Sequence, residues 1–159
     1  MLNEDYRDML RALSDEKVKF LLVGAYAMAA HGHPRATMDI DIWVQPSRAN
    51  AEAVLRALDR FGAPLRDLTR EDLQKEGIVF QIGVAPRRVD ILTSVSGLRF
   101  EEAFARSVPV DLEGIEVHIP SRDDLIRNKR ACGRTKDLAD AEALESPADA
   151  GPDARPDKQ

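Results

Sequence analysis

The strongest constraint on the fold is the alternation of residues 38–44, Met-Asp-Ile-Asp-Ile-Trp-Val. Alternation with a period of two predicts a β-strand with one face in the core. It places Asp39 and Asp41 on the same face, with Cα atoms roughly 6.6 Å apart. The opposite, core-facing side carries Ile40, Ile42 and Val44. The chain is therefore expected to build a sheet that carries two carboxylates on one face.

The surrounding sequence predicts further helices and strands around this strand. Apolar residues at helical spacing, with capping residues at their ends, predict helices at 3–15, 25–31, 48–61, 100–106, 122–132 and 135–144. Short apolar or alternating runs predict strands at 19–23, 78–82, 88–92, 108–112 and 115–119. The second and third of these are expected to pair antiparallel, and Glu113-Gly114 predicts a hairpin turn between the last two. The fold class is α/β (α+β), a mixed β-sheet with flanking helices and a C-terminal helical segment.

Length and composition indicate one folded domain. The chain has 159 residues, of which 43% are hydrophobic, enough for a single core. The domain is expected at 1–145, and the Pro-, Ala- and Asp-rich segment 146–159 is expected to be a disordered tail.

Charge, cysteine content and hydropathy indicate the setting. The net charge of −5 does not favour general nucleic-acid binding, although it leaves room for a local basic patch. No window approaches the roughly 18 apolar residues that cross a bilayer, and the polar N-terminus is unlike a signal peptide. Cys132 is alone, so it is expected to be a small buried or half-buried helix residue. These features favour a cytoplasmic protein with no membrane partner.

The candidate site is a set of three acids, Asp39, Asp41 and Asp90. Two carboxylates on one strand face repel each other and resist ionising together. Mg²⁺ would offset that repulsion, since it prefers a few carboxylates together with water and phosphate oxygens. Asp90 lies among apolar residues of its strand, where an acid needs a partner or a metal. Taken alone, the pattern also fits solvated acids on a half-exposed strand and a hydrogen-bonded acid at position 90.

Three residues before the acidic strand suggest a phosphate site. Gly24 lies where a strand turns into a helix, and such a junction offers free backbone N–H groups to an anion. Arg35 and Thr37 stand just upstream of Asp39, and a guanidinium pairs well with phosphate oxygens. Each signal is weak by itself, because glycines end many strands and a loop arginine can simply face solvent.

Together these residues resemble a known family. The stretch 22–42, with its glycine, helical spacer and Asp-Ile-Asp, resembles the signature of the polymerase-β-type nucleotidyltransferase superfamily. The run 31–41, His-Gly-x-x-Arg-x-Thr-x-Asp-Ile-Asp, is similar to a group of small bacterial nucleotidyltransferases that includes abortive-infection and toxin–antitoxin components. A late segment, Lys129 followed by residues 134–140, Arg-Thr-Lys-Asp-Leu-Ala-Asp, is also common in that group.

The resemblance implies roles for these residues. Asp39 and Asp41 would hold two Mg²⁺ ions, or Mn²⁺, and Asp90 would share one ion and help to deprotonate the acceptor hydroxyl. Gly24 and Ala25 would lie against the triphosphate of an NTP, although Ala25 stands where the superfamily usually has serine or glycine. The resemblance also implies a phosphate-binding cation at Lys129. Arg134, Lys136 and Asp137 either join this site or form an ion network at the start of their helix.

The implied activity is transfer of a nucleoside monophosphate from an NTP to a hydroxyl of a macromolecular acceptor. The acceptor is either RNA, such as a tRNA 3′ end, or a protein side chain. A toxin with a cognate antitoxin partner is the sharper version. The alternative is a catalytically silent binding partner, for instance an antitoxin, which the alanine at position 25 keeps open.

Two further features, a pair of histidines and a tryptophan, have both a structural and a site interpretation. His31 and His33 lack the further ligands that zinc needs, so His31 is expected to cap a helix end or to bond near the site. Trp43 shares a strand face with the two acids and is either a core aromatic or a border of the base or acceptor.

Overall fold

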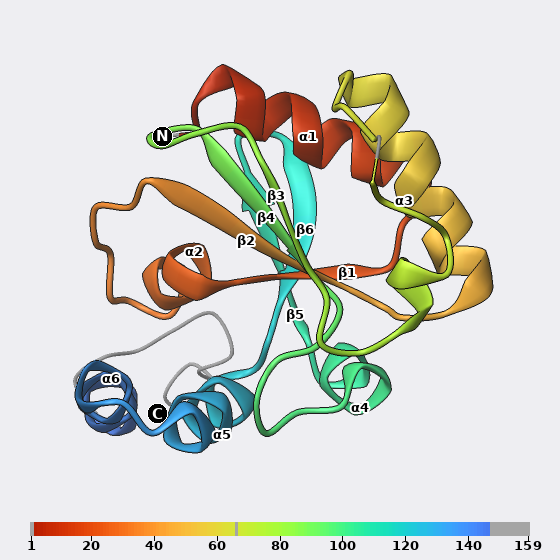
Figure 1. Cartoon of the computed structure of the whole chain (residues 1–159). Helices are drawn as coiled ribbons and strands as arrows, with labels where there is room; N and C mark the ends of the chain where they lie inside the picture. Colours follow the sequence, from red (N-terminus) through yellow and green to blue (C-terminus); the bar gives the residue numbers. More distant parts are fainter. Residues whose placement is uncertain (1, 66, 147–159) are drawn as a thin grey trace.

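The computed structural model describes residues 2–65 and 67–146, which form a mixed four-stranded sheet, a separate hairpin and surrounding helices (Figure 1). The strands are β1 Phe20–Val23, β2 Asp39–Val44, β3 Val79–Ile82, β4 Arg88–Leu92, β5 Val108–Leu112 and β6 Ile115–Ile119. The main sheet has the order β1-β2-β4-β3. The β2–β4 pair is parallel, and β1 and β3 pair antiparallel with their neighbours. The predicted fold class is therefore confirmed.

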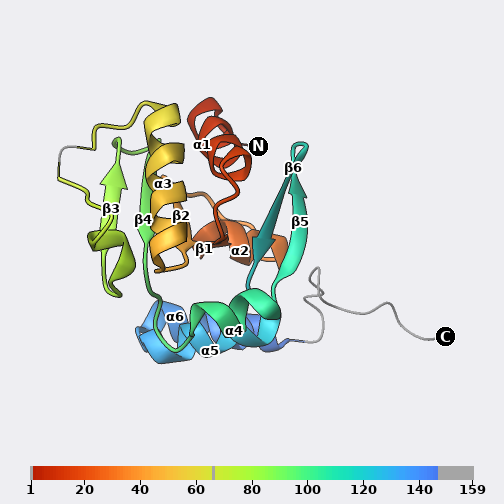
Figure 2. The ribbon, with the colours of Figure 1, turned by 90° about the vertical axis from the view of Figure 1, so that its right-hand side faces the viewer.

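The helices form groups on two sides of the sheet. They are α1 Glu4–Asp15, α2 Gly24–Ala30, α3 Arg48–Phe61, α4 Phe100–Ala105, α5 Arg122–Cys132 and α6 Thr135–Glu145, with a 3₁₀ turn at Asp72–Gln74. Figure 2 shows α1 and α3 side by side at one end, and α4, α5 and α6 together at the other. Within the described ranges, no helix is both long and apolar enough to cross a membrane.

The alternation of β2 places its aliphatic side chains in the main core. Ile40, Ile42 and Val44 are completely buried, as predicted. They belong to one apolar cluster with side chains of α1 and α3, including Met9, Leu10, Leu13, Val54 and Leu58. Burial of several such side chains supplies most of the driving force for this layer. The other face of β2 is thereby left to Asp39 and Asp41.

Local sequence signals set the ends of most elements. Asn3, Ser47 and Ser121 each accept a hydrogen bond from a backbone N–H in the first turn of α1, α3 and α5. Gly62 and Gly133 end α3 and α5 in the left-handed conformation, where a residue without Cβ costs least. These boundaries agree with the predicted ones to within about one residue, which is the usual scatter of helix ends.

The β5–β6 hairpin lies beside β1 and is tied to the N-terminus. Its turn residues Glu113 and Gly114 both have positive φ, +50° and +90°, as a two-residue hairpin turn requires. The Glu113 carboxylate accepts hydrogen bonds from the Leu2 backbone N–H at 2.6 Å and from Arg7 at 2.7 Å. The predicted turn is confirmed, and its side chain fastens the hairpin to α1.

Two expectations about the C-terminal part have different outcomes. Cys132 is exposed in the last turn of α5, so the prediction of a buried or half-buried residue was wrong. The reason is that α5 turns its Leu125 face to the core and its last turn to solvent. The disordered tail was predicted at 146–159, and of this segment residues 147–159 lie outside the described residues.

A buried asparagine of α3 bonds the residues next to the ends of β1 and β2. These bonds lead to a prediction about stability. Asn50 accepts a hydrogen bond from the Lys19 N–H at 2.8 Å and donates to the carbonyls of Lys19 and Gln45, both at 3.0 Å. We expect Asn50→Ala to lower the free energy of unfolding by about 1–3 kcal/mol, because partly buried backbone groups of Lys19 and Gln45 lose their partners. Urea denaturation measures this change. Arg48→Ala, at an exposed position two residues earlier in α3, is the control and should change stability by less than about 0.5 kcal/mol.

Candidate active site

The parallel pairing of β2 and β4 brings the three acids together. In the register of these strands Asp41 lies opposite Asp90, and Asp39 lies opposite Arg88. One carboxylate oxygen from each of Asp39, Asp41 and Asp90 lies within 4.8 Å of the others. Asp90 is buried and the other two are half-buried. The structure therefore places all three predicted acids in one cluster, although 49 residues separate Asp41 from Asp90 along the chain.

Gly24 allows this cluster to form at the end of β1. It has a φ of +68°, and a Cβ atom built on it would lie 2.2 Å from Oδ2 of Asp41. Any side chain at position 24 would displace the Asp41 carboxylate and also strain the backbone. Glycine is thus required here for two independent reasons, the close approach and the left-handed conformation.

Arg88 neutralises part of the acidic cluster. Its Nη2 lies 2.6 Å from Oδ2 of Asp39, and its Nε lies 3.2 Å from Oδ1 of Asp90. The hydrogen bond to Asp39 and the charge of Asp90 raise the pKa of Arg88. The sequence interpretation missed this residue. Its signal was its position two residues before Asp90, which places both side chains on one face of an alternating strand.

Asp41 carries the unbalanced part of the charge. No ion pair to Asp41 is present within residues 2–65 and 67–146. Burial, followed by the charges of Asp39 and Asp90, raises the pKa of Asp41 from 3.8 to about 7. Desolvation and like charges both disfavour the ionised carboxyl group. The cluster therefore holds more negative charge than Arg88 compensates.

The donor set fits a divalent cation. Three carboxylates offer hard oxygen ligands of the kind that Mg²⁺ and Mn²⁺ prefer. The buried Oδ1 of Asp90 makes no hydrogen bond to the described residues, because its contact with Arg88 has the distance of an ion pair without the direction of a hydrogen bond. The Thr37 hydroxyl lies 3.1 Å from Oδ1 of Asp39 and orients that carboxylate. The residues present thus fit a metal ion at this place.

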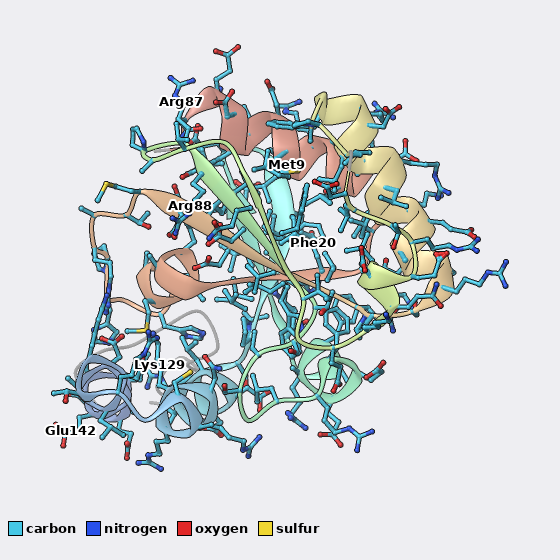
Figure 3. All side chains as sticks on the ribbon, in the orientation of Figure 1. Met9, Phe20, Arg87, Arg88, Lys129 and Glu142 are labelled. Atoms are coloured by element: carbon cyan, nitrogen blue, oxygen red, sulfur yellow. The ribbon has the colours of Figure 1, made fainter. Side chains whose placement is uncertain are left out.

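A cavity of about 590 Å³ extends from the acids towards α5 and α6. Seven of the predicted site residues line it: Gly24, Ala25, Arg35, Thr37, Asp39, Asp41 and Lys129. Asp90 belongs to the acidic cluster but does not line the cavity. Figure 3 labels Arg88 on the sheet and Lys129 on α5, with α2 between them in this view. Chemically, the cavity joins a metal-binding set of acids to a wall with positive charge.

Two buried acids of α6 hold the cations of that wall. Asp140 accepts two hydrogen bonds from Arg35, at 2.8 and 3.2 Å, and lies 3.0 Å from Nζ of Lys129. Asp137 lies 2.7 Å from Nε of Arg134 and 3.8 Å from Nζ of Lys129. Although burial opposes it, the bonds from Arg35 and Lys129 hold the pKa of Asp140 below its usual value. Arg134 and Asp137 form an ion pair at the start of α6, and both also line the cavity together with Lys136, so the two predicted alternatives coexist.

His31 and Trp43 have structural positions. His31 is fully buried at the end of α2, and its Nε2 lies 2.9 Å from the Pro120 carbonyl oxygen, just before α5. Trp43 is 1% exposed and packs edge-on against Phe100 with ring centroids 5.1 Å apart. The interpretation of Trp43 as a core aromatic is therefore confirmed.

A family model matches residues 7–154, nearly the whole chain, and is described as the nucleotidyl transferase AbiEii toxin of a type IV toxin–antitoxin system. The chain belongs to the AbiEii family. This membership confirms the resemblance to small nucleotidyltransferases and the toxin–antitoxin association. An AbiEii protein implies a paired antitoxin and a nucleotide substrate. No curated protein matches the sequence.

Solved structures show the same fold as this AbiEii chain. A putative nucleotidyltransferase, TM1012 from Thermotoga maritima, is 17% identical with a TM-score of 0.59, covering 91% of this chain and 92% of its own. The antibiotic-resistance factor ANT(2″)-Ia in solution is 15% identical with a TM-score of 0.54, covering 88% and 80%. Its crystal structure in complex with adenylyl-2″-tobramycin is 15% identical with a TM-score of 0.53, covering 87% and 84%. At these identities the likeness concerns the fold.

The contact between Gly24 and Asp41 yields a prediction for metal binding. We expect Gly24→Ala to weaken Mn²⁺ binding at least about tenfold, because the new methyl group displaces a ligand carboxylate. Gly62→Ala is the matched control, since Gly62 also has positive φ, +91°, but a Cβ there meets nothing within 4 Å. It should cost about 1–2 kcal/mol of stability from backbone strain and leave Mn²⁺ affinity unchanged. Titrations followed by electron paramagnetic resonance measure the affinities. Equal affinities in the two variants would contradict the assignment.

The raised pKa of Asp41 predicts how stability depends on pH in the metal-free protein. Between about pH 4 and pH 7 the folded state keeps a proton on Asp41 that the unfolded state has lost. This group therefore makes the free energy of unfolding fall as the pH rises through that range, and its effect is constant above pH 7.

We expect Asp41→Asn to remove this decline and to be more stable than the parent at pH 8 in EDTA, by roughly 1–3 kcal/mol. Urea denaturation at pH 5 and pH 8 measures the difference. Asp59→Asn, at an exposed position of α3, should follow the parent at both pH values. A parallel decline in Asp41→Asn and the parent would show that Asp41 ionises normally.

Proposed function

We propose that this chain transfers a nucleoside monophosphate from an NTP to a hydroxyl of a macromolecular acceptor, with two Mg²⁺ or Mn²⁺ ions bound by Asp39, Asp41 and Asp90. The observation that carries the proposal is the convergence of these carboxylates within 4.8 Å, two of which, Asp39 and Asp41, line a cavity whose other wall is positively charged. A nucleoside triphosphate bound with divalent cations matches both ends. The family and the fold support the same reaction class.

Binding of the triphosphate falls to the lining of the cavity. Gly24 and Ala25 present backbone without a polar side chain beside Asp41, so phosphate oxygens can approach their N–H groups closely. Ala25 contributes no hydroxyl, which leaves more of the binding to cations. Arg35 and Lys129, side by side through Asp140, are positioned to neutralise the triphosphate.

The chemical step needs position and charge more than covalent help from the protein. When bound, the divalent ions supply charge neutralisation for the attacking and departing oxygens. The acceptor oxygen forms a bond to the α-phosphorus while the bond to pyrophosphate breaks. Asp90, which clusters with Asp39 and Asp41, would share one of the ions and in that way help to deprotonate the acceptor hydroxyl.

Transfer of label tests the function. The full chain is incubated with each α-labelled NTP, Mg²⁺ and either total tRNA or a protein lysate. We expect label on one of these acceptors, and at least a hundredfold loss in Asp39→Ala, because a metal-binding carboxylate is removed. Asp59→Ala, a surface aspartate of α3, should retain parental activity.

The toxin role predicts that expression of the parent slows growth and that expression of Asp39→Ala does not. Absence of transfer by the parent to either acceptor, with equal growth effects of both proteins, would contradict the enzymatic proposal. That result would leave the non-catalytic binding function.

A further inference from the structure

The face of the sheet that carries the acids changes from charged to apolar along β4. Arg88, Asp90 and Leu92 alternate onto this face, each roughly 6.6 Å from the next. Leu92 and Val95 line the same cavity as the acids and pack against the buried cluster of Trp43 and Phe100. One side of the cavity is therefore apolar and packed against a buried cluster, next to the carboxylates.

Two of the cations that line the cavity come from other elements: Arg35 belongs to the segment between α2 and β2, and Lys136 belongs to the first turn of α6. A third, Lys129, belongs to α5 and lies 3.0 Å from Asp140 of α6. An NTP has a highly charged end and an apolar base, with the reacting phosphorus between them. When the α-phosphate of an NTP lies at the acids and its β- and γ-phosphates lie at the cations, its base lies against Leu92 and Val95.

Asn128 of α5 also lines the cavity and contacts the loop that carries Val95. Its Nδ2 donates to the Ser96 carbonyl oxygen at 2.8 Å and lies 3.9 Å from Sγ of Cys132. Its Oδ1 accepts no hydrogen bond from the residues that the structure describes. The amide nitrogen is therefore occupied, and the oxygen is the atom left for a ligand.

The contact with Ser96 fixes which way the amide faces. A rotation that exchanged the two amide atoms would place Oδ1 against the Ser96 carbonyl oxygen, and two acceptors cannot bond. The loop cannot easily withdraw, because it packs directly on α5. At Gly97, whose φ is +80°, a Cβ would lie 2.7 Å from Cβ of Ala131 and 3.2 Å from the Arg127 carbonyl oxygen. The loop that carries Val95 and the helix that carries Asn128 thus form one unit.

We propose that Oδ1 of Asn128 accepts a hydrogen bond from the base of the bound NTP. It selects a base with an amino group in place of an oxo group at purine C6 or pyrimidine C4, namely adenine or cytosine. The proposal rests on the function proposed above and deepens it. An amino group donates a hydrogen bond to Oδ1. The oxo group of hypoxanthine or uracil at the same position sets two acceptors against each other and loses that bond.

Pairs of nucleotides that differ at this position test the proposal. Competition with a fluorescent NTP, in Mg²⁺ and without acceptor, gives the affinities of the full chain for ATP against ITP and for CTP against UTP. We expect the amino member of at least one pair to bind about fivefold to tenfold more tightly, as one hydrogen bond at this position provides. Equal binding within both pairs would overturn the proposal without any variant.

Two variants test the role of the side chain. Asn128→Ala should reduce the ratio within the preferred pair to below about twofold, with a much smaller change in the affinity for its oxo member. Ser96→Ala keeps the backbone carbonyl that orients the amide and should keep the parental ratio. Circular dichroism confirms that both variants are folded. A parental ratio in folded Asn128→Ala would overturn the assignment to Asn128.

The same data separate this inference from the proposed function. If no NTP binds the parent in Mg²⁺, or if Asp39→Ala binds NTP as well as the parent does, the proposed function fails and the inference fails with it. If NTPs bind in a manner that depends on Asp39 but show no amino preference, the inference alone is wrong.

Discussion

The mutual repulsion of Asp39, Asp41 and Asp90 is the interaction on which the rest of the site depends. Parallel pairing of β2 and β4 forces the three carboxylates together, and the absence of a side chain at Gly24 gives Asp41 its room. Arg88 offsets part of the charge, and burial together with the charges of Asp39 and Asp90 raises the pKa of Asp41. A fold that maintains such a cluster gives up stability in its metal-free form, and the three carboxylates fit a divalent cation.

On the opposite wall of the cavity, cations outnumber carboxylates. There two buried carboxylates, Asp137 and Asp140, hold three cations from the segment before β2, from α5 and from the start of α6. The cations remain in excess on this wall, so it suits an anion. Because the Asp140 carboxylate joins Arg35 and Lys129, the positions of both cations are coupled to the packing of α6. Side chains that hold each other in this way are pre-organised before a substrate arrives.

The secondary structure and the acids were predictable because their signals are local. Alternation over seven residues identified β2, and capping residues such as Ser47 and Gly62 located α3 at the observed residues. Contacts between distant residues were not predictable in the same way. The alternation of β4 places Arg88 on the face of Asp90, but that Arg88 also reaches Asp39 depends on the pairing of β2 with β4. Cys132 was placed in the wrong environment because its exposure depends on how the end of α5 packs. The pairing of Arg35 with Asp140 joins positions 105 residues apart.

That a strand with two acids on one face follows a glycine turn could be read from the amino acids alone, because side-chain periodicity and backbone freedom are properties of neighbouring residues. The same holds for family membership, which covers residues 7–154. Three features became visible only in the folded chain: Asp90 lies opposite Asp41, Arg88 pairs with Asp39 and Asp90, and the Asn128 amide is oriented by the Ser96 carbonyl. Each of these depends on strand register and helix packing, which are set by the burial of the whole core and not by any short segment.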